Sequence, residues 1–229
     1  MRCGLYGKLP AKRDFVAIAA PREFLDLWEP WLQSGVSASK LQLGQDWKRS
    51  FLRAPIWRFW LGADLCGVTV AGAFMPSVDG VGRYFPLTVL AAADRGASIP
   101  PPETDPQYGW FEHLEAFLLG ALEERGNFDA FTAELAQLPP PSVEKAKALR
   151  EGVARISPNA VIALTETTPL PEALATAREL VGAQAYALTS FWWTVGGEGI
   201  RPVVIVAAKM PDAQIFVQML TGVFSSLST

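Results

Sequence analysis

The chain has 229 residues, half of them hydrophobic, and a formal net charge of −3, which predicts a globular protein with a sizeable buried core and argues against disorder. This charge excludes the basic excess that nucleic-acid binding or polybasic docking to a membrane requires. The longest apolar run, Val203 to Ala208, is far too short to cross a bilayer, so we expect a cytoplasmic protein without integral membrane association.

The first third of the chain mixes strand and helix signals. A short apolar strand begins at residue 3, and a turn follows over 7–10. Helical periodicity covers 21–32 and 37–52, and Pro30 should kink or end the first of these two helices. The period then changes to that of β structure, in three apolar segments joined by short turns. These segments predict an antiparallel meander with strands over 55–61, 65–75 and 84–93.

A proline-rich linker, residues 94–106, separates this meander from a region with helical periodicity and capping residues. The helices predicted there and at the end of the chain cover 106–125, 127–138, 142–152, 168–182 and 211–220. Apolar runs predict three further strands, and a glycine-rich turn joins the last two into a hairpin. These strands cover 160–164, 185–195 and 200–208.

This order of elements predicts an α/β fold. A mixed, largely antiparallel sheet would be covered by helices on both faces, as a three-layer α/β/α sandwich. We expect a single domain over 1–229, with the linker 94–106 as the one candidate boundary within it.

The cysteines and the histidine give no sign of a metal or cofactor site, and no cofactor is predicted. Cys3 and Cys66 belong to no ligand spacing, so we expect two buried thiols in a reducing cytoplasm. His113 lies one residue off the apolar stripe of its helix. With no second histidine to assist it, we expect a boundary residue and not a catalytic base.

The sequence is unusually rich in tryptophan, with eight residues, and two of them, Trp192 and Trp193, are adjacent on a predicted strand. Neighbouring strand residues point to opposite faces. Both rings are internal if the sheet is covered on both sides, whereas one is an exposed anchor for a partner if it is not. Arg58 shares a face with Trp60, where it can stack on the ring, pair with a carboxylate or decorate the surface.

The most polar turn of the sequence covers residues 76–86, and it carries no signature of a known catalytic site. Ser77 and Asp79 can hydrogen-bond each other, but no base accompanies them in sequence. Arg83 is placed to pair with Asp79 across the turn, which would make this loop rigid with a charged tip. The segment from Gly4 to Lys8 lacks the glycine spacing and the hydroxyl of a phosphate-binding loop.

Several long motifs, in one order, resemble the TagF (ImpM) family of type VI secretion-associated proteins. They are "GLYGKLPAKRDFV", "WLQSGVSASKLQLGQDW", "APIWRFWL", "CGVTVAGAFMPSVDGVGRYFPLTV", "FWWTVGG" and "MPDAQIFVQMLTG". The resemblance implies a cytoplasmic factor of Gram-negative bacteria that restrains the secretion machine after translation, with a forkhead-associated scaffold protein as its partner. One residue departs from the family pattern: Arg13 stands where the family has a glycine, and a positive φ there would strain the turn.

Two functions follow as hypotheses. The first is a non-enzymatic repressor of type VI secretion assembly that binds its partner through charged loops and aromatic anchors, with Leu9, Phe15 and Val16 holding the first loop in the core. The candidate protein-binding residues are Lys8, Lys12, Arg13, Asp14, Arg58, Ser77, Asp79, Arg83, Trp192 and Trp193. The alternative is a hydrolase or small-ligand enzyme with Lys8, Ser77, Asp79 and Arg83 in a cleft, which requires an enclosed polar pocket at those residues.

Overall fold

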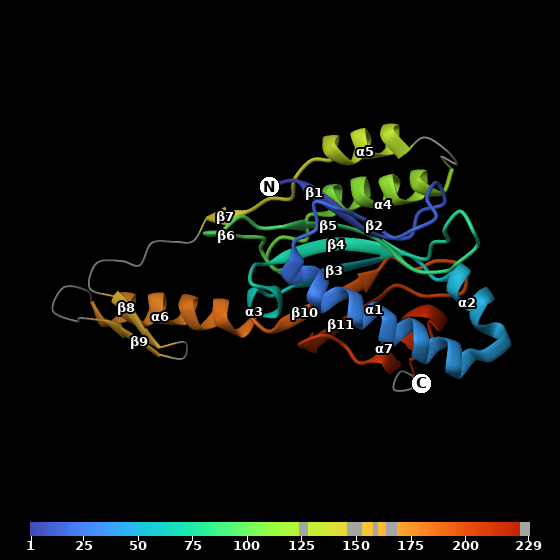
Figure 1. The fold of residues 1–229 in the computed structure, drawn as a ribbon. Coiled ribbons are helices and arrows are strands. Elements are labelled where there is room, and N and C mark those ends of the chain that lie inside the picture. The colour runs from blue at the N-terminus through green and yellow to red at the C-terminus, as the bar shows by residue number, and fades with distance from the viewer. Residues whose placement is uncertain (124–127, 146–152, 158–159, 164–168, 225–229) are drawn as a thin grey trace.

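A seven-stranded antiparallel sheet forms the centre of the computed structural model, which describes residues 1–123, 128–145, 153–157, 160–163 and 169–224 (Figure 1). The strand order is β11-β10-β3-β4-β5-β1-β2, and every neighbouring pair is antiparallel. The strands are β1 (Cys3–Gly7), β2 (Val16–Ile18), β3 (Trp57–Leu61), β4 (Val70–Met75), β5 (Leu87–Ala92), β10 (Thr189–Thr194) and β11 (Val203–Ala208).

Helices cover both faces of this sheet, which confirms the predicted α/β fold. On one face lie α1 (Arg22–Leu43), α2 (Trp47–Arg53) and α7 (Ala213–Thr221), and on the other lie α4 (Tyr108–Glu123) and α5 (Phe128–Gln137) (Figure 1). Each face has its own buried cluster. The first joins Trp28, Phe59, Trp192 and Phe216, and the second joins Leu5, Val89, Leu114 and Phe117.

The two helices at the ends of the described chain, α1 and α7, pack closely. A Cβ atom at Gly35 of α1 would lie 2.4 Å from the ring of Phe216 of α7, so only glycine allows this approach. The predicted C-terminal helix is confirmed: the Asp212 side chain accepts a hydrogen bond from the Ile215 amide at 3.0 Å, and Gly222 ends the helix with a φ of 70°.

The remaining elements are short or lie outside the main sheet. They are η1 (Gly44–Asp46), α3 (Ala63–Cys66), β6 (Ala97–Ser98), β7 (Glu144–Lys145), β8 (Val153–Ser157), β9 (Ala160–Ala163) and α6 (Leu170–Ala185). β6 pairs with β7, and β8 pairs with β9. In Figure 1, α6 and the β8–β9 pair lie together to one side of the seven-stranded sheet.

The predicted end of the helix at Pro30 is wrong, because α1 runs through this residue. The buried residues Phe24, Trp28, Leu32 and Val36 are spaced by four and stay in phase on both sides of the proline. Burial of this stripe outweighs the cost of about 3 kcal/mol for a proline inside a helix. One long helix therefore replaces most of the two that the periodicity suggested.

Three further segments differ from the prediction. The turn at 62–64 is the start of the short helix α3, and the linker 94–106 contains strand β6. The helix predicted over 142–152 is wrong at residues 144–145, which form β7, and its remainder from 146 lies outside the described residues. The strand at 160–164 is present as β9, but Ile162 is exposed because β9 pairs outside the main sheet.

The cysteines are buried and unbridged, as predicted. Burial raises the pKa of the Cys3 thiol to about 11 and that of Cys66 to about 12, so neither is a thiolate at neutral pH. His113 is exposed on α4, and its Nδ1 lies 2.6 Å from the Gly109 carbonyl oxygen.

Candidate functional site

Two loops leave the sheet at the same end. β1 ends at Gly7 and β4 ends at Met75, and both of these residues lie opposite Leu87 of β5. Residues 8–15, which follow β1, and residues 76–86, which join β4 to β5, are therefore neighbours. We call these two segments the loop pair.

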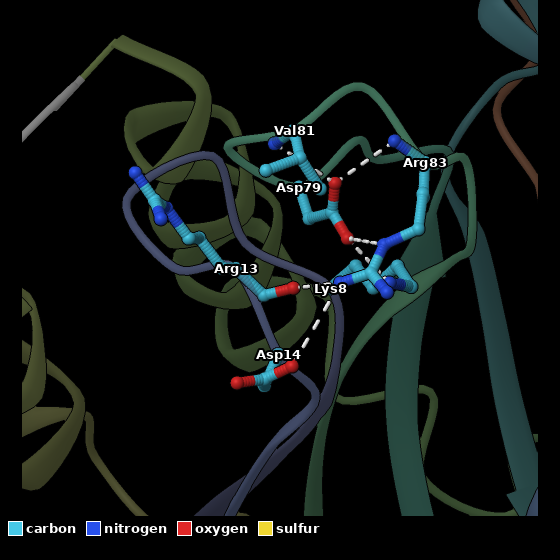
Figure 2. A network of polar contacts seen from close by, with 6 residues as sticks. All are labelled: Lys8, Arg13, Asp14, Asp79, Val81 and Arg83. Atoms are coloured by element: carbon cyan, nitrogen blue, oxygen red, sulfur yellow. Dashed lines mark hydrogen bonds and ion pairs between the residues drawn. The ribbon is translucent and has the colours of Figure 1, made fainter.

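A buried ion pair joins the two loops (Figure 2). Lys8 Nζ lies 2.5 Å from Asp79 Oδ2, and Arg83 Nε donates to the same oxygen at 2.7 Å. The side chains of Lys8 and Asp79 are 6% and 0% exposed, whereas that of Arg83 is 55% exposed. The predicted pairing of Arg83 with Asp79 is thus present, and Lys8 adds a second, buried cation.

Asp79 also organises the turn of its own loop. Its Oδ1 accepts hydrogen bonds from the Val81 amide at 3.1 Å and the Arg83 amide at 2.8 Å. The Asp79 amide donates to the Arg83 carbonyl at 3.0 Å, and Gly82 takes a φ of 87° that favours glycine. This carboxylate therefore holds its own loop and also binds Lys8 of the other loop.

The same contacts keep Asp79 ionised. Burial alone would raise the pKa of its carboxyl, but the hydrogen bonds from Lys8, Arg83 and Val81 outweigh burial and hold the pKa below its ordinary value. Asp79 is therefore a fixed negative charge at neutral pH, and it has no proton to donate in general acid catalysis.

Further contacts fix the first loop from both sides. The Gly80 amide donates to the Lys12 carbonyl at 2.8 Å, and the Arg83 guanidinium donates to the Arg13 carbonyl. On the other side, Lys12 Nζ lies 3.8 Å from the ring centre of Phe128 in α5. The loop pair is thus one connected unit.

This unit presents charges of both signs and some apolar surface to solvent. Arg13 is exposed, the Asp14 side chain is 98% exposed, and Val81 is 55% exposed. Phe15 is 47% exposed, so its predicted place in the core is wrong. Because the neighbouring strand β2 is at the edge of the sheet, the Phe15 ring is only partly covered, by Tyr6, Phe85 and the ammonium group of Lys8.

Arg13 does not strain its turn. The non-glycine residues with positive φ in the described chain are Ala19, Gln107 and Lys209, and Arg13 is not among them. Arginine therefore fits at this position, and its carbonyl serves as an acceptor for Arg83.

We accordingly expect Arg13→Gly to destabilise the protein slightly, by roughly 0.4–1 kcal/mol, because glycine gives the unfolded chain more freedom. Urea denaturation measures this change. A gain in stability would mean that the position prefers a positive φ.

Arg58 and Trp192 do not lie on the surface, which corrects their assignment to a protein-binding face. Arg58 is buried on β3, where its Nε donates to Glu115 Oε1 of α4 at 2.6 Å. Its guanidinium carbon lies 5.4 Å from the ring centre of Phe111. Pairing with a carboxylate, one of the alternatives that the sequence left open, is thus the one found.

The two adjacent tryptophans point to opposite faces, and both faces are covered. Trp192 is fully buried between α1 and the sheet, where it stacks on Trp28 at 5.6 Å between ring centres. Trp193 is half-buried on the other face and packs edge-on against Phe111 at 4.8 Å. Neither ring is an exposed anchor.

Ser77 lies in the same loop as Asp79 but in different surroundings. Its hydroxyl is buried and has no hydrogen-bond partner in the described part of the chain, so the predicted bond to Asp79 is not formed. Ser77 lines a cavity of about 360 Å³ with residues such as Leu52, Leu119 and Leu122. Neither Lys8 nor Asp79 lines this cavity, which is largely apolar.

Two partners of the candidate residues, Glu115 beside Arg58 and Phe128 beside Lys12, escaped the sequence analysis. Glu115 directly follows the buried residue Leu114 on α4. A carboxylate next to the apolar stripe of a helix was the signal that could have predicted its buried ion pair with Arg58. Phe128 packs partly against the core, and nothing in the sequence linked it to Lys12.

Neither a metal centre nor a membrane segment emerges from the described residues. Within them, histidine, cysteine, aspartate and glutamate form no group of three or more that could hold a metal ion. None of the described helices has the length and apolar character needed to span a bilayer.

Comparisons with known proteins identify one matching family and one similar solved structure. A family model described as the TagF N-terminal domain, type VI secretion system-associated, matches residues 4–138, which include the whole loop pair. The crystal structure of PA0076 from Pseudomonas aeruginosa PAO1 is similar over 99% of this chain and 97% of that chain, with 33% sequence identity and a TM-score of 0.78. No curated protein matches the chain.

Proposed function

This chain belongs to the TagF family of type VI secretion system-associated proteins, and on that premise we propose that it represses assembly of the secretion system after translation, by binding another protein. Its partner in this proposal is the forkhead-associated scaffold protein of the system, in the cytoplasm. The surface it uses is the loop pair.

The observation that carries this proposal is the network of contacts that joins the loop pair. The buried ion pair between Lys8 and Asp79 and the contacts of Arg83 fix two loops from distant parts of the sequence. A surface that is ordered before binding loses less conformational freedom on association. Its exposed charges, on Arg13, Asp14 and Arg83, then give specificity for one partner.

The same residues favour binding over catalysis. A hydrolase with Ser77 as nucleophile needs a base within hydrogen-bond reach of the hydroxyl. The Ser77 hydroxyl has no such contact among the described residues, and Lys8 and Asp79 neutralise each other outside the cavity that Ser77 lines. We therefore propose that the protein is not an enzyme.

Repression by binding requires only a difference in affinity. If the protein binds the scaffold better in a state that is not assembled, its presence shifts the scaffold towards that state by mass action. The extent of repression then depends on the concentration of this protein relative to its dissociation constant.

We expect the double substitution Arg13→Glu with Asp14→Lys to weaken binding to the purified scaffold protein of the same bacterium at least tenfold, measured by calorimetry. Both side chains are exposed, so the melting temperature should stay close to that of the wild type. In cells, the variant should release secretion from repression.

The matched control is Arg22→Glu with Asp26→Lys, which inverts another exposed pair of an arginine and an aspartate on α1. This control should bind as the wild type does. Equal weakening by both variants, or by neither, would remove the loop pair as the binding surface. A deletion strain with unchanged secretion would remove the proposed function itself.

A further inference from the structure

The two edge strands of the sheet differ strongly. β2 has three residues and lies next to the charged loop pair, as is common for edges that are protected from pairing. β11 has six residues, all of them apolar, and no described strand pairs with its outer side. Its outward backbone amides and carbonyls are thus available to another strand.

One face of β11 is also uncovered. Val203 and Ile205 pack against the cluster beneath α1 and α7, whereas Val204 and Val206 are 66% and 59% exposed. The exposed valines lie opposite Trp193 and Phe191 of β10, on the face that α4 and α5 cover nearer the centre of the sheet. A strand added to this edge would shield both valines.

Cations stand at both ends of this strand. Arg201 and Lys209 are exposed, neither is in an ion pair within the described residues, and no acidic residue lies between them. A second copy of the chain fits poorly in the register centred on Ile205. In that register Val204 of one copy pairs with Val206 of the other, and Arg201 faces Lys209 at both ends, where like charges repel.

We propose that β11 binds an extended segment of a different protein, one that has apolar residues opposite Val204 and Val206 and acidic residues opposite Arg201 and Lys209. The segment pairs antiparallel, like every neighbour in this sheet, and continues it by one strand. This second interface lies at the opposite edge of the sheet from the loop pair and is independent of the function proposed there.

The test uses a synthetic nine-residue peptide with aspartate at both ends, valine at the fourth and sixth positions and threonine elsewhere. We expect it to bind the full-length chain and to shift the amide resonances of residues 203–208. A peptide with lysine at both ends should bind about tenfold more weakly at low salt, because both end contacts become repulsive. Methylation of alternate backbone nitrogens in the first peptide should abolish binding.

The matched variant is Arg201→Glu with Lys209→Glu, which should reverse the preference and bind the lysine-ended peptide more tightly. Arg13→Glu in the loop pair serves as a control and should leave peptide binding unchanged, so failure of one interface is distinguishable from failure of the other. The proposal is overturned if the wild-type chain binds neither peptide. It is also overturned if the Arg201→Glu, Lys209→Glu variant still binds the aspartate-ended peptide more tightly than the lysine-ended one. A dimer with protected β11 amides would overturn it too, by showing that a second copy covers the strand.

Discussion

Asp79→Ala should lower the free energy of unfolding at pH 7 by about 3–5 kcal/mol, because it removes one partner of a buried ion pair. Lys8 would keep a buried charge with no carboxylate beside it. The amides of Val81 and Arg83 would lose their acceptor in the same step. Urea denaturation with the wild type as reference measures the loss.

Two variants separate the buried pair from a general effect of losing a charge. Asp46→Ala removes a carboxylate that lies 2.9 Å from Arg49, but both side chains are exposed, so the loss should stay below about 1 kcal/mol. Lys8→Met with Asp79→Leu should be less destabilising than Asp79→Leu alone, since no buried charge is left unpaired. A double variant that is less stable than the single one would contradict this account.

The pH dependence of the unfolding free energy also tests the contribution of Asp79. The pKa of Asp79 is lower in the folded protein than its ordinary value of 3.8. The ionised carboxylate therefore stabilises the fold at pH values above 3.8, and this contribution is lost progressively as the pH falls below it. The difference in stability between the wild type and Asp79→Ala should shrink in the same acidic range.

Trp28→Ala should be comparably destabilising, by roughly 3–5 kcal/mol, because it leaves a large cavity at the centre of one face. The Trp28 ring is fully buried, and its Nε1 donates to the Thr88 hydroxyl at 3.0 Å. It packs against Phe59 and Trp192 with ring centres 4.4 and 5.6 Å away. Calorimetry should show a melting temperature lowered by roughly 10 °C.

Leu41→Ala is the matched control, since Leu41 lies on the same helix but is 89% exposed. It should change stability by less than about 0.5 kcal/mol. Trp28→Phe retains an aromatic ring, so its loss of stability should lie between those of Trp28→Ala and Leu41→Ala. Equal effects of the Trp28 and Leu41 substitutions would mean that α1 does not contribute its aromatic stripe to the core.

The elements that the sequence predicts well are those whose signals are local. The glycine turn between β10 and β11 and the Asp212 and Gly222 caps of α7 lie within a few residues of the structure they determine. The helix end predicted at Pro30 is wrong because the local preference of proline is opposed by a stripe of buried aromatic residues. The packing partners of this stripe are far away in the sequence. Tertiary burial decides such a conflict.

In the candidate site, too, only the contacts between residues close in the sequence could be predicted. The contact of Asp79 with Arg83 spans four residues and could be predicted from the turn. The contacts of Lys8 with Asp79 and of Arg58 with Glu115 depend on which strands and helices become neighbours, and the sequence does not state this. For that reason Lys8 and Arg58 were placed among the candidate protein-binding residues, whereas both are buried.

The close packing of Gly35 against Phe216 affects how the polypeptide is made. The face of the sheet beneath α1 closes only when β10 and α7 are in place, so residues 4–138 lack part of their own core. During translation, Trp28 and Trp31 leave the ribosome long before residue 221 does. The nascent polypeptide thus carries an open aromatic surface for most of its synthesis, and we expect holding chaperones to bind it until α7 is made.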